Sequence, residues 1–192
     1  MATPRRARDS SLLDTVEALP FGPLDRHAWR VVREGRDPTQ CSASGGRWDD
    51  GTFDVLYTST TADGALAEMY FHLSKGQPVF PSRVAYKLFE LEIVIASCVT
   101  IADMDGVEAL GVKTGTFGRL SYEERQGEYP RTQEVGEASH FHGRDGLLVP
   151  SARSDHPNLV ILCDRAGPAA VDMMRDHGII DWSRWRKKSF GY

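Results

Sequence analysis

The fold class is decided by residues 53–73, which read Phe-Asp-Val-Leu-Tyr-Thr-Ser-Thr-Thr-Ala-Asp-Gly-Ala-Leu-Ala-Glu-Met-Tyr-Phe-His-Leu. Residues 53–58 are apolar, aromatic or β-branched at most positions, which predicts a short strand. The hydroxyl and carboxylate side chains that follow are typical helix caps. Residues 65–73 predict a helix that Gly76 ends, because apolar side chains recur at helical spacing on one stripe. These side chains are Leu66, Met69 and Leu73.

Outward from this strand and helix, strand-like and helix-like segments alternate along the chain. Predicted strands lie at 27–33, at 83–99 (one or two strands), at 147–149 and at 159–162. The other segments are predicted as a long loop at 34–50, loops with a short helix at 103–133 and a short helix at 171–177. This order predicts a mixed α/β, or α+β, fold.

The chain of 192 residues has a length that suits one domain, and 41% hydrophobic with 26% charged residues is typical of a globular protein. We expect the globular part at residues 26–180. Residues 1–25 are expected to be a tail with a helical turn or two around residues 12–19. Residues 181–192 are expected to be a second tail, basic and aromatic in character.

The charge balance argues against several classes of partner. Lys and Arg number 23 and Asp and Glu 27, so the net charge of −4 lacks the surplus of cations with which proteins bind nucleic acid. No apolar run reaches the ~18 residues of a membrane helix. Arg5, Arg6 and Arg8 are not followed by the apolar region of a secretory signal. We therefore expect a cytoplasmic protein that binds neither nucleic acid nor a membrane.

The cysteines support the same compartment. Cys41, Cys98 and Cys163 are three in number and widely spaced, which argues against a disulfide framework and against a structural zinc site. Cys98 and Cys163 lie in apolar runs and are expected to be small core residues in a reducing cytosol.

Three local motifs carry candidate chemistry. Gly45-Gly46-Arg47-Trp48 places a guanidinium, which suits phosphate or carboxylate, beside two flexible glycines. Glu68 lies on a helix in apolar surroundings, where a carboxylate is costly without a partner. Ser151 follows the run Asp-Gly-Leu-Leu-Val-Pro in a turn without a nucleophile elbow. Each motif also has a purely structural interpretation, as a surface arginine, a helix-surface carboxylate and a turn serine.

Taken together, the motifs resemble the RES domain family, which is named after an Arg, a Glu and a Ser. The matching residues are Arg47, Glu68 and Ser151. The strings Gly-Gly-Arg-Trp, Val-Leu-Tyr-Thr-Ser, Ala-Leu-Ala-Glu, Asp-Gly-Leu-Leu-Val-Pro-Ser-Ala-Arg and Asn-Leu-Val-Ile are also similar to the family. The resemblance covers about residues 29–164.

The resemblance implies a toxin of a bacterial type II toxin–antitoxin pair, with a fold similar to that of ADP-ribosyltransferase toxins. Its partner would be an Xre-type antitoxin with a DNA-binding helix-turn-helix. Its activity would be destruction of NAD⁺ by phosphorolysis or hydrolysis of the nicotinamide–ribose bond, without a metal. Inorganic phosphate would then be a further ligand.

Roles follow from the chemistry of that bond. Glu68 would stabilise the positive charge that develops on the ribose. Arg47, and second Arg30, would bind phosphate groups. The nicotinamide ring would stack against Tyr57. The hydroxyl of Ser151 would hydrogen-bond phosphate or ribose, supported by Asn158.

Two features depart from the family or stay open. Asp49 and Asp50 follow the motif where an Asn is expected, and two acids beside Arg47 would weaken its affinity for phosphate. His72 and His140 are either proton carriers or exposed histidines.

Two alternative functions remain open. One is transfer of ADP-ribose from NAD⁺ to a protein target. The other is a non-catalytic nucleotide-binding module.

Overall fold

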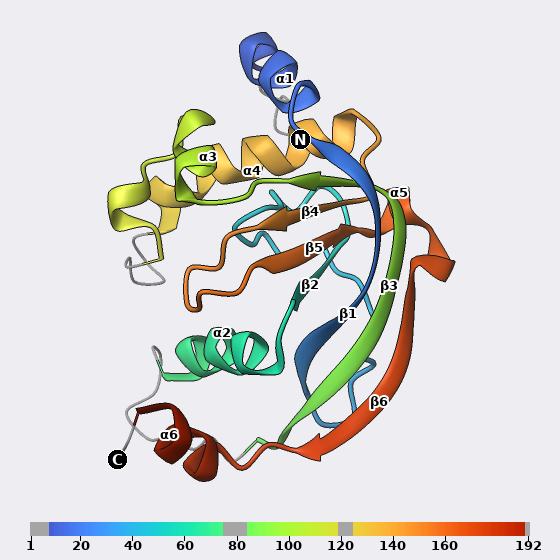
Figure 1. Ribbon diagram of the computed structural model, residues 1–192, viewed down its shortest axis with the longest axis vertical. Helices are drawn as coiled ribbons and strands as arrows, with labels where there is room; N and C mark the ends of the chain where they lie inside the picture. Colours follow the sequence, from blue (N-terminus) through green and yellow to red (C-terminus); the bar gives the residue numbers. More distant parts are fainter. Residues whose placement is uncertain (1–7, 75–83, 119–124, 191–192) are drawn as a thin grey trace, which may run out of the picture.

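The computed structural model describes residues 8–74, 84–118 and 125–190, and Gly76 lies outside these ranges. The described chain is a mixed α/β domain in which helices pack against parts of one strongly curved sheet (Figure 1). The helices are α1 (Ser10–Glu17), α2 (Ala62–Ser74), α3 (Met104–Ala109), α4 (Arg125–Phe141), α5 (Cys163–Ala166) and α6 (Trp182–Phe190), with short 3₁₀ turns η1 (Thr114–Thr116) and η2 (Pro168–Ala170). The strands are β1 (Phe21–Arg33), β2 (Val55–Ser59), β3 (Tyr86–Thr100), β4 (Gly146–Val149), β5 (Asn158–Leu162) and β6 (Val171–Ile179).

The described strands form a sheet in the order β1-β2-β5-β4-β3-β6. The long strands β1 and β3 also pair with each other, so the first five strands close into a ring and β6 is added to β3 outside it. Only the β3–β4 pair is parallel among the described strands. The strong curvature of β1 and β3 closes the ring (Figure 1).

The strand β5 is apolar from Leu159 to Leu162 because both of its faces are buried. In β5, Val160 and Leu162 belong to one core cluster, whereas Leu159 and Ile161 belong to a second cluster on the other face. Strands buried on two faces lose the polar–apolar alternation of a half-buried strand. Helices α1 and α4 cover the first cluster, since Val16 and Val135 are both part of it.

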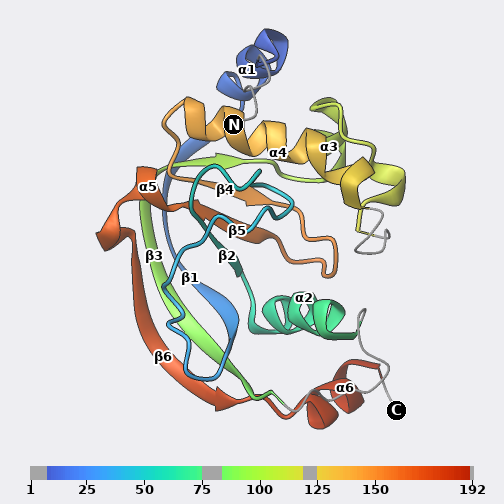
Figure 2. The ribbon, with the colours of Figure 1, turned by 180° about the vertical axis from the view of Figure 1, so that it is seen from behind.

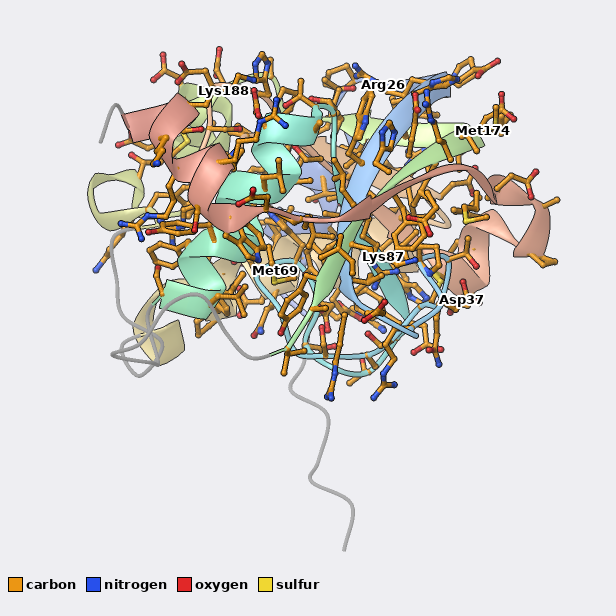
Figure 3. All side chains as sticks on the ribbon, turned by 90° about the horizontal axis from the view of Figure 1, so that it is seen from below. Arg26, Asp37, Met69, Lys87, Met174 and Lys188 are labelled. Carbon is orange, nitrogen blue, oxygen red and sulfur yellow. A yellow bond between two sulfur atoms is a disulfide. The ribbon has the colours of Figure 1, made fainter. Side chains whose placement is uncertain are left out.

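A third cluster lies between α2 and α6. Tyr70 of α2 packs against Trp182 and Trp185 of α6, and the indole nitrogen of Trp185 donates a hydrogen bond to Asp63 at 3.3 Å. Figure 3 shows α6, with Lys188, alongside α2, with Met69. The segment expected as a basic tail is therefore a helix that supports α2. At the other end of the chain, α1 and the start of β1 show that residues 10–25 are also folded onto the domain.

The strand register gathers the ends of three strands at one place. Asn158, the first residue of β5, pairs with Ser59 at the end of β2 on one side and with Val149 at the end of β4 on the other. The helix α2 begins three residues after Ser59, and Ser151 follows two residues after Val149. This register explains how residues far apart in sequence meet in one site.

Two secondary-structure predictions are wrong. Residues 171–177, predicted as a short helix, belong to the strand β6, which pairs with β3 from Val171↔Ile93 to Ile179↔Lys87. The prediction of loops and one short helix at 103–133 missed α4, which continues to Phe141 and includes Pro130.

The expectations that the cysteines form no disulfide framework and that Cys163 is an unpaired core residue are also wrong, so the cysteines no longer support a reducing compartment. Cys41 and Cys163 are joined by a disulfide across 122 positions of sequence, and Cys98 is a free, buried thiol. The disulfide fastens the long loop between β1 and β2, which Figure 2 shows on the near side of the molecule, to the end of β5.

Candidate active site

A cleft of about 420 Å³ lies where these strand ends meet. One wall is the face of α2 that carries Ala65, Glu68 and His72, as helical spacing predicts. The middle of β1, the loop of residues 44–51 (the Gly-Gly-Arg loop), the turn after β4 and the start of β5 form the rest. Pockets of several hundred Å³ with a few convergent polar groups are typical ligand sites.

Glu68 is held from two sides by the residues that the sequence predicts as its neighbours in the site. Its Oε1 atom accepts a hydrogen bond from the Ser151 hydroxyl at 2.7 Å and another from Asn158 Nδ2 at 2.8 Å. Among the residues that the structure describes, no other group hydrogen-bonds to this carboxylate, so Oε2 keeps its acceptor capacity. A half-buried carboxylate fixed at one oxygen is pre-organised to face a positive charge.

Ser151 is oriented by its own turn. Its hydroxyl oxygen accepts hydrogen bonds from the backbone N–H of Arg153 at 3.0 Å and of Ser154 at 3.2 Å. These donors leave the hydroxyl proton to point at Glu68. Ser151 is thus a positioning group for Glu68 in this structure.

Arg47 lines the cleft, and its guanidinium packs against two aromatic rings. Its guanidinium carbon lies 4.1 Å from the centroid of Phe117 and 4.9 Å from that of Tyr129, both within cation–π distance. These contacts hold the guanidinium in place, and its forked donors are of the kind that suits a phosphate.

Arg30 also lines the cleft, but its Nη1 atom forms hydrogen bonds within the protein that stabilise the fold. It donates to the carbonyl oxygens of Pro38 at 2.7 Å and Gln40 at 2.9 Å, which fastens the start of the long loop to β1. Burial lowers the pKa of Arg30 to about 10, an effect that the nearby Asp37 opposes. The guanidinium is therefore charged at neutral pH.

Tyr57 lines the cleft, and its hydroxyl is engaged by two residues of the Gly-Gly-Arg loop. The hydroxyl donates to Asp49 Oδ2 at 2.8 Å and accepts from the backbone N–H of Trp48 at 2.9 Å. Burial, together with the charge of Asp49, raises the pKa of Tyr57 well above its usual value. Tyr57 stays protonated, so it offers a ligand its ring rather than a proton.

The two acids beside Arg47 turn away from the ligand side. The carboxylate of Asp49 is fully buried under its own loop, and Asp50 caps Thr52. Neither acid lines the cleft, and their effect on the affinity of Arg47 for phosphate stays a prediction.

The two histidines differ in position. His72 lies on the cleft wall. His140 is absent from that wall: its Nε2 lies 2.7 Å from Asp164 Oδ2, and its ring stacks on Phe53.

Several residues at the site escaped the sequence analysis. Gln133 donates its amide to the carbonyl of Gly46 at 2.8 Å, and Gly136 lets α4 approach the carbonyl of Trp48 so closely that a Cβ atom would meet it at 1.9 Å. Tyr129 and Phe117 support Arg47. No local motif marks these residues, because they lie on α4 and the segment before it, far in sequence from the Gly-Gly-Arg loop that they contact.

No group of three or more His, Cys, Asp or Glu side chains in the described part of the chain is arranged to hold a metal ion. None of the helices described is both long and apolar enough to cross a bilayer.

The strands, helices and cleft together define a mixed α/β protein with a candidate ligand site where the strand ends meet. The model of the RES domain matches residues 27–186, so the chain belongs to the RES domain family. A chain in the crystal structure of the MbcT–MbcA toxin–antitoxin complex of M. tuberculosis shares the fold, with a TM-score of 0.78 and 17% sequence identity over 94% of this chain and 98% of that one. No curated protein matches the sequence.

Proposed function

We propose that this protein is the toxin of a bacterial toxin–antitoxin pair and that it cleaves the nicotinamide–ribose bond of NAD⁺. The observation that carries the proposal is the carboxylate of Glu68, which Ser151 and Asn158 hold by one oxygen in a cleft that Arg30, Arg47 and Arg153 also line. A fixed carboxylate beside cationic groups matches a substrate that joins a developing cation to a pyrophosphate.

The chemistry of the bond fits this arrangement. When the bond between the nitrogen of nicotinamide and C1′ of ribose breaks, its electron pair stays on the nitrogen and neutralises the pyridinium. The ribose is left with oxocarbenium character, which the negative charge of Glu68 stabilises. An oxygen of hydrogen phosphate or of water then bonds to C1′ and releases its proton to the solvent, and no net oxidation occurs.

The remaining residues bind and orient the substrate. Arg47, with Arg30 as the second cation, faces the negative pyrophosphate or an attacking inorganic phosphate. The ring of Tyr57 supplies an aromatic surface for the nicotinamide. Ser151 and Asn158 hold Glu68, so loss of either would leave its charge in a less productive orientation.

Product analysis tests the proposal and separates its variants. The purified protein is incubated with NAD⁺ with and without phosphate, and the products are resolved by liquid chromatography and mass spectrometry. Release of nicotinamide supports the proposal, and the second product, ADP-ribose or its 1-phosphate, identifies water or phosphate as the acceptor. NAD⁺ that stays intact under both conditions contradicts it.

Transfer of ADP-ribose to a protein uses the same NAD⁺-binding residues. This alternative is therefore tested with labelled NAD⁺, by finding which product carries the label. NAD⁺ labelled on the adenylate would then leave a labelled protein band in a bacterial lysate. A purely structural cleft would bind no NAD⁺ in a calorimetric titration.

A toxin needs restraint, and the neighbour of known structure is a toxin–antitoxin complex. We infer an Xre-type antitoxin partner in the cytoplasm that covers the cleft between Gly46 and Glu68. Co-expression should yield a stable complex in which NAD⁺ is no longer cleaved, whereas a complex with full activity would contradict this arrangement.

A further inference from the structure

The carboxylate of Asp49 organises the Gly-Gly-Arg loop from inside. Its side chain is fully buried, and in the described part of the chain it forms no ion pair with a Lys or Arg. Oδ1 accepts hydrogen bonds from the backbone N–H of Gly45 at 2.7 Å and of Gly51 at 3.2 Å. Oδ2 accepts from the N–H of Gly46 at 2.7 Å and from the Tyr57 hydroxyl at 2.8 Å.

Four donors compensate a charge that would otherwise be costly to bury. Hydrogen bonds to an ionised acceptor are shorter and stronger than neutral ones. The loop thus wraps its own side chain, in the way that backbone N–H groups wrap a bound anion. Breaking this arrangement would leave a buried carboxylate without hydrogen-bond partners, which costs free energy. The buried carboxylate therefore stabilises the observed conformation of the loop.

The glycines of the loop are required by this wrapping. Gly45 and Gly51 have φ angles of +68° and +83°, which other residues rarely adopt. A Cβ atom on Gly46 would lie 2.6 Å from the Tyr57 hydroxyl and 2.9 Å from Asp49 Oδ2. The pair Gly45-Gly46 therefore serves the approach to Asp49, in addition to any approach to a ligand.

Asp49 holds Gly46 and Tyr57, and both residues line the cleft. Gly46 directly precedes Arg47 in the sequence. From the other side, Gln133 of α4 holds the carbonyl of Gly46. Asp49 lies beneath the loop and touches neither the ring faces nor the guanidinium edge that a ligand would meet.

We propose that Asp49 is a positioning residue. By fixing Arg47 and Tyr57, it sets the affinity of the cleft for the pyrophosphate of NAD⁺. The inference rests on the proposed function for its ligand. The loop geometry itself does not depend on that function. Glu68 is held by separate contacts, so loss of Asp49 affects binding more than the chemical step.

The test compares Asp49→Ala and Asp49→Asn with the matched control Asp50→Ala, which removes the neighbouring, exposed acid. We expect Asp49→Ala to raise KM for NAD⁺ by roughly tenfold or more, about 1.4 kcal/mol, with kcat within about threefold of wild type. Asp49→Asn keeps one acceptor oxygen for Gly45 and Gly51 and is expected to recover part of the loss. Asp50→Ala should match wild type.

Hydrogen–deuterium exchange gives a readout that does not need NAD⁺. The peptide that contains residues 45–51 should exchange faster in Asp49→Ala than in wild type and Asp50→Ala, while the peptide that contains Glu68 should not change. Faster exchange without any NAD⁺ cleavage by wild type would mean that the loop-holding role stands and the proposed reaction fails. Unchanged exchange, or a fall in kcat with KM unaltered, would overturn the inference.

Discussion

Opening the disulfide between Cys41 and Cys163 is expected to destabilise the domain and to loosen the loop that leads into the site. The bond joins positions 122 apart in sequence, so it strongly restricts the unfolded chain. The chain-entropy relation for a closed loop of this length gives about 5 kcal/mol at 25 °C. Residual structure in the unfolded chain lowers the effect, so a loss of about 3–5 kcal/mol is expected.

The assay is urea unfolding followed by tryptophan fluorescence. Wild type is measured with and without dithiothreitol, next to Cys41→Ser, and the variant should unfold at the midpoint of reduced wild type under both conditions. Cys98→Ala is the control, because Cys98 is the buried free thiol and its removal should leave the redox-dependent shift in place.

The disulfide also determines how many thiols are free to react. Under denaturing, non-reducing conditions, alkylation should label one of the three cysteines. Three labelled cysteines, or a midpoint that dithiothreitol does not move, would refute the account of how the loop is fastened.

Three other changes test separate parts of the structure. Gly136→Ala should destabilise the domain by about 1–3 kcal/mol because its Cβ would collide with the carbonyl of Trp48, whereas Gly115→Ala, which meets nothing within 4 Å, should not; thermal unfolding compares them. Arg30→Met keeps the aliphatic stem but leaves two loop carbonyls without their donor, so we expect a loss of about 2–3 kcal/mol in urea unfolding and weaker NAD⁺ binding. Asp9 caps α1, and hydrogen bonds from Ser11 and Arg131 lower its pKa to about 2. Its contribution is therefore present above about pH 4 and lost as the pH falls toward 2, so the difference in Tm between wild type and Asp9→Ala should shrink over that range; a difference that is constant with pH would contradict this.

The sequence was informative where the side chains that face a core follow a simple period. The strand at 53–58 and the helix at 65–73 are confirmed as β2 and α2, and the predicted face of α2 with Glu68 does line the cleft. Ser151 and Asn158 were also predicted at the site, and both bond to Glu68.

The helix α4 could not be recognised in this way because its buried stripe is made of small residues. Thr132, Val135, Gly136 and Ser139 are buried at helical spacing, but only Val135 is large and apolar. Small side chains let α4 come close to the Gly-Gly-Arg loop, and the same property removes the hydrophobic signal on which prediction depends.

The strand β6 was predicted as a helix for a different reason, which is its exposure to solvent. Six consecutive residues, 172–177, are exposed, so neither face imposes an alternating pattern. Its extended conformation comes from backbone hydrogen bonds with β3, and these leave no mark on local composition. The disulfide was missed because cysteine spacing does not reveal which residues a closed sheet brings together.

The role of the Glu68 carboxylate is tested by comparing wild type with Glu68→Gln in the release of nicotinamide from NAD⁺. Glutamine keeps an oxygen that accepts from Ser151 and Asn158 but removes the charge that faces the ribose. We predict release by wild type and a rate lower by roughly 10²–10³ in the variant, with Glu108→Gln on the exposed face of α3 equal to wild type. Release by Glu68→Gln at the wild-type rate would contradict the account.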